Sequence, residues 1–459
     1  MTRPQHTRNL ITSAVVLACC TSLSAIAAPD GTAQANRVIR PVTVAHNEQG
    51  DVAPMSEPRG GCRQGSPWFA GIGHLTDGYA SDAYGVSPDG HYVVGSSEGF
   101  DYPSGSSAYL HAVAWNACNG LRTLPGTPQD AGWSTAFSVS NTGRHVGGIV
   151  SLDFEKGGMW LNRTDGMDAL ANPDLDYNQS VVVRSVSADG SAFAGAASDR
   201  DGEEAFVYFL GELQARMLGD LPGGAVGSAA YAVSHHANAV VGHSFSTSGQ
   251  EAFLWRTGGQ LVGLGDLPGG AFESQALGVN ADGTVVVGYA TSAQGRQAFR
   301  WTASGGMVGL GDLPGGGFSS EALAVSADGN VIVGRATSSS GEEAFIWTPD
   351  TGMRSIHEVA DGYFPSSFSQ WTLLSARGIS ADGVVIVGSA INPDGLFEGW
   401  VLELPRGCRA DWNADGLLNT SDFFGFLDQF FLGDADFSGD NLTNTQDFFE
   451  YLTAFFAGC

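Results

Sequence analysis

The residues best suited to chemistry lie near the C-terminal end, in two twelve-residue segments that begin at Asp411 and Asp436. Each segment carries oxygen-bearing side chains at its positions 1, 3, 5, 9 and 12 and offers a backbone carbonyl at position 7, which is how a loop surrounds Ca²⁺. Position 6 must turn sharply, and it is Gly416 in one loop and Asn441 in the other. The predicted calcium ligands are Asp411, Asn413, Asp415, Leu417, Asn419 and Asp422 in the first loop, and Asp436, Ser438, Asp440, Leu442, Asn444 and Asp447 in the second.

The elements that must position these ligands are two Phe-rich segments, 422–427 and 447–452, which we expect to be helical. An acidic pair of turns without metal is the alternative. It is disfavoured because residues 408–459 hold eight Asp and one Glu against one Arg, and these charges would repel one another. A module this small needs metal, and preferably a disulfide, for stability.

Cysteine positions suggest where such disulfides form. Cys408 and Cys459 flank the C-terminal module, which favours their pairing and leaves Cys62 with Cys118. Four cysteines allow three connectivities, so the pairing stays open.

A repeat fills most of the remaining chain. The phrase Val-Ser-x-Asp-Gly, with variants, occurs seven times and provides a tight turn between two strands. The copies begin at Val86, Val139, Val186, Val233, Val279, Val325 and Ile379, which lie 46 to 54 residues apart. Each unit reads as four short strands, which is typical of a β-propeller; a β-solenoid is the alternative, but its coils are usually shorter.

The two ends of the repeat complement each other. The last unit stops after its third strand, Phe397–Val401, whereas Gly71–Leu75 matches a fourth strand and precedes the first unit. A propeller can close its ring with such a strand, and closure removes exposed sheet edges. We therefore predict an all-β, seven-bladed β-propeller over residues 66–405, followed by a small α-helical domain with two calcium loops at 408–459.

Composition limits the classes of function. The 459 residues carry a net charge of −27, which argues against binding nucleic acid or anionic membranes. Residues 1–27 have the pattern of a secretory signal peptide, and 28–65 are expected to be a flexible linker. No other run reaches the roughly 18 apolar residues of a membrane span, so we expect a secreted or cell-surface protein.

The repeats resemble the secreted HAF-repeat family through the runs Glu204-Ala205-Phe206, Glu251-Ala252-Phe253, Gln297-Ala298-Phe299 and Glu343-Ala344-Phe345. That family brings no established activity. The duplicated loop-helix segment, which ends Ala457-Gly458-Cys459, resembles a dockerin. This resemblance implies docking to a cohesin-like or cell-surface protein. It also implies that loop positions 10 and 11 help to choose the partner, here Thr420, Ser421, Thr445 and Gln446.

Recurring carboxylates such as Glu251 and Asp266 are expected to serve the blades, and we predict no catalytic residue. Two insertions break the repeat. The first lies between Gly95 and Trp115, and the second lies between the fourth strand of the sixth unit and the seventh unit and carries the residues from His357 to Trp371. Their aromatic side chains are expected to meet over one face and to stack on a sugar or grip a peptide. The alternative is that the two loops pack on each other. The predicted ligand-binding residues are Phe100, Tyr102, Tyr109, Tyr363, Phe364 and Trp371.

The sequence thus favours a secreted, non-enzymatic binding protein that uses calcium to dock and whose propeller presents a face that binds a ligand, such as a polysaccharide, or a partner. A carbohydrate-active enzyme is the alternative, with an acid/base pair drawn from Glu98, Asp101, Glu358 and Asp361. A structural surface or matrix component is a further alternative. Released sugar products would identify the enzyme.

Overall fold

The structure is a computed structural model. It describes residues 40–43, 68–76, 78–100, 108–124, 133–152, 154–162, 166–171, 180–199, 202–361, 363–364, 368–405, 412, 420–433, 435, 437 and 443–457. The predicted signal peptide and most of the predicted linker lie outside these residues.

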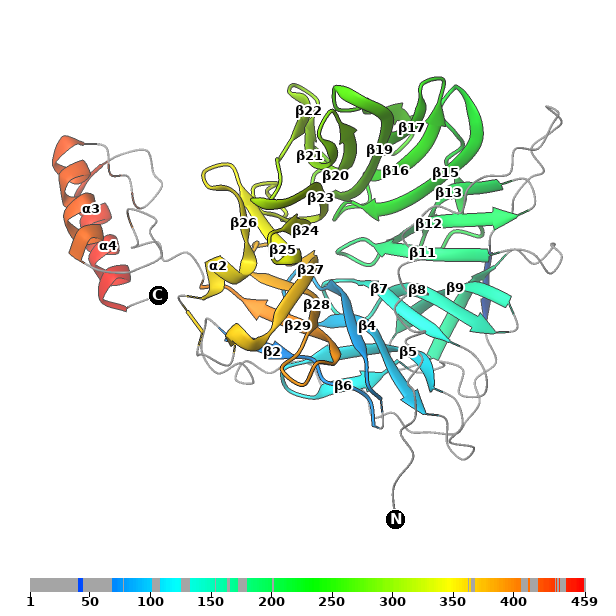
Figure 1. Cartoon of the computed structure of the whole chain (residues 1–459), viewed down its shortest axis with the longest axis horizontal. Coiled ribbons are helices and arrows are strands. Elements are labelled where there is room, and N and C mark those ends of the chain that lie inside the picture. Colours follow the sequence, from blue (N-terminus) through cyan, green and yellow to red (C-terminus); the bar gives the residue numbers. More distant parts are fainter. Residues whose placement is uncertain are drawn as a thin grey trace, which may run out of the picture. The chain divides into compact units, whose positions relative to one another are not determined.

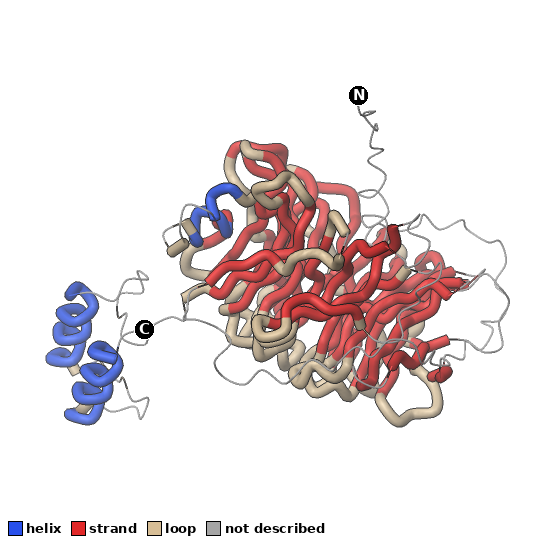
Figure 2. Tube along the Cα trace, turned by 90° about the horizontal axis from the view of Figure 1, so that it is seen from below, coloured by secondary structure: helices blue, strands red, loops and turns tan. Residues whose placement is uncertain are grey.

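Strands dominate residues 68–405 (Figure 2) and form antiparallel groups of four in chain order. The first groups are β3 (Ser81–Val86), β4 (Val93–Phe100), β5 (Ala108–Asn116) and β6 (Gly120–Thr123); β7 (Ser134–Val139), β8 (Val146–Leu152), β9 (Phe154–Asn162) and β10 (Gly166–Ala171); and β11 (Ser180–Val186), β12 (Ala192–Asp199), β13 (Gly202–Phe209) and β14 (Arg216–Met217). Strand β1 (Arg40–Thr43), within the predicted linker, pairs with β10.

Three further groups are the most regular. They are β15 (Gly223–Val233), β16 (Ala239–Ser246), β17 (Gly249–Arg256) and β18 (Val262–Gly263); β19 (Gly269–Val279), β20 (Val285–Ser292), β21 (Gly295–Thr302) and β22 (Gly306–Gly309); and β23 (Gly315–Val325), β24 (Ile332–Ser338), β25 (Gly341–Thr348) and β26 (Gly352–Ser355). Single parallel pairs, Gln250 with Glu273 and Arg296 with Ser319, join these three groups into one sheet.

The last group takes strands from both ends of the repeat. Strands β27 (Thr372–Ile379), β28 (Val385–Ile391) and β29 (Phe397–Glu403) are completed by β2 (Trp68–Gly71), which pairs antiparallel with β29. The predicted closure by an N-terminal strand is therefore confirmed, but the predicted extent was wrong, because the strand runs from Trp68 to Gly71 and not from Gly71 to Leu75. The indole of Trp68 explains this, because it donates to Glu403 Oε2 (2.5 Å) and stacks on Trp115.

Backbone contacts beyond β2 reproduce those of an ordinary unit. The Ile72 amide donates to Gly399 O, and the Gly73 amide donates to Glu398 Oε1 at 2.9 Å. The Gly265 amide donates to Glu251 Oε1 at the same distance. The N-terminal segment thus takes the place of a fourth strand and of the connection that follows it.

The recurring Ser-x-Asp-Gly phrase makes the turn between the first and second strands. Ser326 Oγ donates to Asp328 and accepts from the Val331 amide at 3.0 Å, while Gly329 has φ +79°. This φ lies in the region that favours glycine. Ala237 occupies the equivalent place in the degenerate copy and takes φ +54°, so that copy still turns.

Neighbouring turns are tied together by backbone hydrogen bonds. Ala281 N donates to Ala327 O, Ala327 N to Ala381 O at 3.0 Å, and Ala381 N to Pro88 O at 2.8 Å. The last of these bonds joins the last group of strands to the first.

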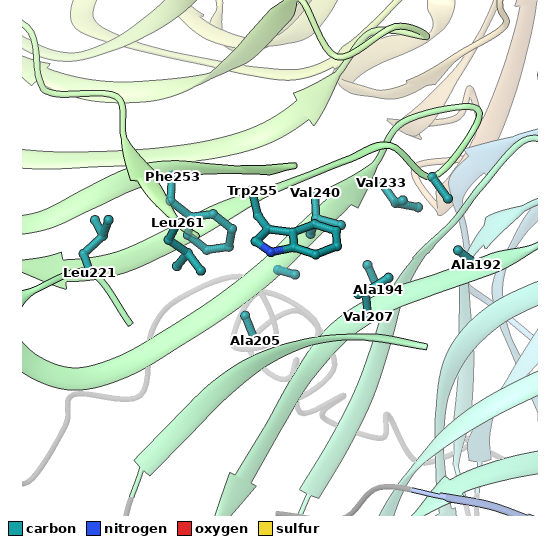
Figure 3. Close-up of a cluster of buried hydrophobic side chains, with 12 residues drawn as sticks. Ala192, Ala194, Ala205, Val207, Leu221, Val233, Val240, Phe253, Trp255 and Leu261 are labelled. Atoms are coloured by element: carbon teal, nitrogen blue, oxygen red, sulfur yellow. The ribbon is translucent and has the colours of Figure 1, made fainter. Parts of the chain in front are cut away.

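Apolar residues fill the spaces between successive groups. One such cluster contains Phe253 and Trp255 of β17 against Val207 of β13 (Figure 3). Another places Val387 and Val401 of the last group against Val93 of the first, so the last group of strands packs against the first. In Figure 1 the groups radiate from a common centre. This arrangement of four-stranded antiparallel sheets is that of a β-propeller, as predicted.

Burial explains why Phe recurs at one position of the repeat. The recurring Phe is fully buried in four successive units, where each side chain fills an inter-sheet cluster: Phe206, Phe253, Phe299 and Phe345.

The helices lie mainly at the C-terminal end. Helices α3 (Thr420–Leu432) and α4 (Thr445–Ala457) confirm the two predicted helical segments. They pack through Phe426 and Tyr451, whose rings are parallel at 3.8 Å between centroids. The second insertion contains α2 (Ile356–Ala360) and the 3-10 turn η1 (Phe368–Gln370). Within the described residues, no helix is long and apolar enough to cross a membrane.

Candidate functional site

The recurring carboxylates hold the fold together, as the sequence indicated. Glu251 accepts from the Gly265 amide, Asp266 from the Glu273 amide at 3.1 Å, and Asp312 from the Ser319 amide at 2.8 Å. Burial raises the pKa of the Asp266 and Asp312 carboxyls. These groups accept backbone hydrogen bonds that fix the entry to the next unit.

The aromatic residues of the second insertion are used in packing. Trp371 and Phe364 contact Phe69 of β2, with ring centroids at 5.2 Å and 6.4 Å, and both rings pack against the core around Trp400. Tyr363 is half-buried. This placement favours a packing role over ligand stacking for Phe364 and Trp371.

The first insertion is described only at its edges. Tyr109 is half-buried in β5, opposite Gly99 of β4, and Phe100 ends β4. Tyr102 lies outside the described residues, as does Asp101. Of the other carboxylates considered for catalysis, Glu98 is buried in β4, whereas Glu358 and Asp361 are exposed in and after α2.

Three of the predicted calcium ligands are described: Asp422, Asn444 and Asp447. Both carboxylates are fully buried near the starts of their helices, and the Asn444 amide donates to Asp447 Oδ2 at 2.7 Å. Burying a carboxylate is costly unless it is compensated, and the Asn444 backbone amide supplies part of that compensation for Asp447. Calcium binding at the two positions stays a prediction.

The other nine predicted ligands lie outside the described residues: Asp411, Asn413, Asp415, Leu417, Asn419, Asp436, Ser438, Asp440 and Leu442. Among the residues that are described, no group of three or more His, Cys, Asp or Glu gathers as a metal site. The predicted partner-selecting residues Thr420, Ser421, Thr445 and Gln446 are exposed at the helix starts.

Cys118 is disulfide-bonded. The cysteines Cys62, Cys408 and Cys459 lie outside the described residues, so the predicted pairing stays a prediction.

A set of side chains that the sequence analysis overlooked lies at the centre of the propeller. Each stands two residues before the first residue of a motif copy, at a register shift in the first strand of its group, and each is half-buried. We call this set the inner ring: Tyr84, Phe137, Arg184, Tyr231, Leu277, Leu323 and Arg377.

Members of the inner ring contact one another across neighbouring sheets. Tyr84 and Phe137 meet edge to face at 5.5 Å. The guanidinium of Arg377 lies over Tyr84 at 4.9 Å, and that of Arg184 lies over Tyr231 at 4.6 Å. The strand that carries each residue lies at the opposite edge of its group from the fourth strand. These contacts therefore place the side chains around the common centre.

Polar side chains beside the inner ring are mostly paired. Glu321 bonds Arg296 at 2.5 Å and Arg335 at 2.8 Å. The hydroxyl of Tyr289 donates to Gln275 at 2.8 Å, and burial raises the pKa of Tyr289 to about 12. These pairs tie the first strands β23 and β19 to the strands behind them.

Two buried groups touch the ring directly. Burial raises the pKa of Asp82, which lies 3.9 Å from Arg377 Nε and accepts from Ser389 Oγ. Burial lowers the pKa of His243 to about 4, so its imidazole is neutral at pH 7, and its ring lies 5.8 Å from Tyr231.

The signal for this site was present in the sequence. Aligning the seven motif copies puts the inner-ring position next to residues that hardly change, while the position itself holds Tyr, Phe, Arg or Leu. The framework demands no particular side chain there. Guanidinium and aromatic groups together suit the binding of a ligand with a polar or anionic group.

No protein-family model matches the chain, and no curated protein does. Among solved structures, the chain is similar to the β-propeller domain of the Trilobed protease from Pyrococcus furiosus, with 11% identity and a TM-score of 0.47 over 71% of this chain and 95% of that one. It is also similar to TolB from Acinetobacter baumannii, with 13% identity and a TM-score of 0.35 over 69% and 81%. A putative TolB from Agrobacterium tumefaciens has 11% identity and a TM-score of 0.34 over 75% and 93%.

Proposed function

We propose that this protein is a secreted, non-enzymatic binding protein whose seven-bladed propeller binds a ligand at its centre and whose C-terminal module docks it through calcium. The observation that carries the proposal is the inner ring. Equivalent positions around the centre hold different polar, aromatic and apolar side chains, whereas the buried positions behind them repeat. Ligand sites are lined mainly by apolar and aromatic side chains with a few polar groups that fix orientation, and the inner ring has this composition.

The blade count rests on the motif copies and on the way the groups of strands pack. Seven copies give seven groups, if β2 is counted with the last three strands. The contact of Val93 with the last group supports a ring made of these seven groups.

Docking is supported by the surface of the C-terminal helices. Phe424 and Phe431 of α3 are 61% and 80% exposed, and their equivalents Phe449 and Phe456 of α4 are 64% and 79% exposed. Large exposed apolar patches mark interaction surfaces. A cohesin-like or cell-surface protein with an apolar surface is the proposed partner. The buried Asp422 and Asp447 are the carboxylates that calcium would hold in place.

Secretion is supported by the signal-peptide pattern of residues 1–27 and by the disulfide-bonded Cys118, because disulfides persist in oxidising compartments.

The test separates binding from catalysis. The mature full-length chain is incubated with soluble polysaccharides and with pooled synthetic peptides, and both retention and released products are measured. We expect at least one class to be retained unchanged, with retention lost in Tyr231→Ala and kept in Leu213→Ala, which changes an exposed loop residue. If the parent releases sugars and the Glu98→Gln variant does not, the enzyme alternative would replace the proposal.

A further inference from the structure

We infer that the inner ring recognises the carboxylate of an acidic peptide segment in which the carboxylate lies next to an apolar residue. This inference rests on the proposed binding function and names the ligand class of the same site.

The first support is a repeated pair of side chains. Arg184 of β11 lies over Tyr231 of β15, and Arg377 of β27 lies over Tyr84 of β3, at 4.6 and 4.9 Å. In both pairs the arginine belongs to one group of strands and the tyrosine to the next. The same device thus occurs at two places around one centre.

The pairs are suited to a planar anion. Stacking on a ring engages the face of a guanidinium and fixes its plane, while the N–H groups point outward from its edge. That edge matches a carboxylate in a bidentate arrangement. The side chains of Arg184 and Arg377 are 16% and 18% exposed. Nη1 of Arg184 is buried and Nε of Arg377 donates to Ser389 Oγ at 2.9 Å, so a ligand would meet the remaining N–H groups.

The charge of the ring differs from that of the whole chain. The chain carries −27, yet the inner ring contains two arginines and no acidic residue. Glu203 of the third strand β13 lies 3.5 Å from Arg184, and Asp82, on the same first strand β3 as Tyr84, lies 3.9 Å from Arg377 and accepts from the Tyr84 hydroxyl at 3.3 Å. These carboxylates help to orient the guanidinium groups.

The apolar members of the ring favour a peptide over a sugar. Phe137, Leu277 and Leu323 are half-buried on the same inner ring. A sugar presents hydroxyl groups that need polar partners, which leucine cannot supply. An apolar amino-acid side chain beside the carboxylate would bury its surface against these residues.

The experiment uses the mature full-length chain and a library of acetylated, amidated hexapeptides. Each peptide contains one Asp or Glu flanked by Leu or Phe, and a matched library contains Asn or Gln instead. We expect binding of carboxylate peptides, measured by calorimetry, and at least tenfold weaker binding of their amide counterparts. Arg184→Gln and Arg377→Gln should each weaken binding at least tenfold, with Arg184→Lys and Arg377→Lys intermediate.

Arg216→Gln is the matched control, because Arg216 is an arginine of the short fourth strand β14 and its side chain is 49% exposed. It should bind the peptides as the parent does, and melting curves should match for every variant used. Equal binding of carboxylate and amide peptides would overturn the inference, as would no binding of either library. Retention of a polysaccharide that depends on Tyr231, without peptide binding, would overturn the ligand class and leave the proposed binding function standing.

Discussion

The propeller and the C-terminal module are both built by duplication, but they repeat different kinds of residue. In the propeller the repeated residues are buried, as with Phe253 and Phe299, whereas the accessible inner ring varies. In the C-terminal module repetition reaches the surface as well. Phe431 and Phe456 occupy equivalent places and are both about four-fifths exposed.

This difference separates what folding needs from what contact with other molecules needs. A buried Phe is explained by the core it fills. An exposed Phe at the same place in both helices adds little to folding, and contact with the proposed partner would account for it. Where the propeller varies, by contrast, the proposed ligand would meet several kinds of side chain.

Deleting residues 66–76 should have the largest effect, because it removes β2 and the buried Ile72 from the last group of strands. We expect the cooperative melting transition of the full-length chain to be lost or to fall steeply. Circular dichroism against temperature measures this. A transition unchanged from that of the parent would contradict closure by the N-terminal strand.

Phe299→Ala should destabilise the protein by about 3–5 kcal/mol, because it empties a fully buried site between two sheets. Leu277→Ala, on the half-buried inner ring of the adjoining strand β19, should cost less than about 1 kcal/mol. Denaturant unfolding of both variants compares the stability lost at a buried framework position with the stability lost at an inner-ring position. Equal costs would remove the distinction between them.

Calcium removal should unfold the C-terminal module and leave the propeller intact. At a calcium concentration of about 100 times Kd, the gain in stability of that module is about 2.7 kcal/mol. The variant Asp422→Asn with Asp447→Asn should lose this gain, whereas Asp428→Asn, on the exposed side of α3, should keep it. The measurement is helical circular dichroism with calcium and with chelator, and an identical response in both variants would refute the metal assignment.

Phe431→Ser with Phe456→Ser should leave the stability of the module within about 0.5 kcal/mol of the parent, because both rings are exposed. Phe426→Ala, in the core of the same module, should be strongly destabilising. Chemical unfolding with calcium present compares the two. A large loss of stability in the surface variant would show that these rings serve folding.

The smallest effect concerns pH. Burial raises the pKa of Asp266 and Asp312 in the folded protein, so the folded state binds these protons more tightly than the unfolded state. Their contribution to stability is fully present below the unfolded value near 3.8 and is lost as the pH rises through the folded pKa. Relative to Asp266→Asn with Asp312→Asn, the parent should therefore gain stability as the pH falls from 7 toward 4. Urea unfolding at several pH values measures this, and a difference that does not change with pH would contradict it.

Much of the fold could be predicted because repetition and strand patterning are local signals. The Asp-Gly turns, the buried Phe and the complementary ends of the repeat all indicated a closed β-propeller. The start of the closing strand was placed too late, because Trp68 is held by Glu403 and Trp115, which are far away in the sequence.

The candidate site was predicted less well. The insertions were predicted to bind a ligand because they break the repeat. Trp371 and Phe364 instead pack against Phe69 of the N-terminal strand, and this contact exists only because that strand closes the ring. The inner ring looked unremarkable in each copy. Only the folded structure shows that these residues form one site, because Arg377 lies at a register shift in its strand and over Tyr84 of another group of strands.

The central claim, that the accessible centre binds while the buried repeat folds, is tested most directly by one binding comparison. The parent, an inner-ring variant (Tyr84→Ala, Arg184→Gln, Tyr231→Ala, Arg377→Gln) and an outer variant (Leu213→Ala, Arg216→Gln) are each titrated with the retained ligand under identical conditions. We expect the inner-ring variant to lose binding while the outer variant binds as the parent does. Equal binding by all three proteins would contradict the account.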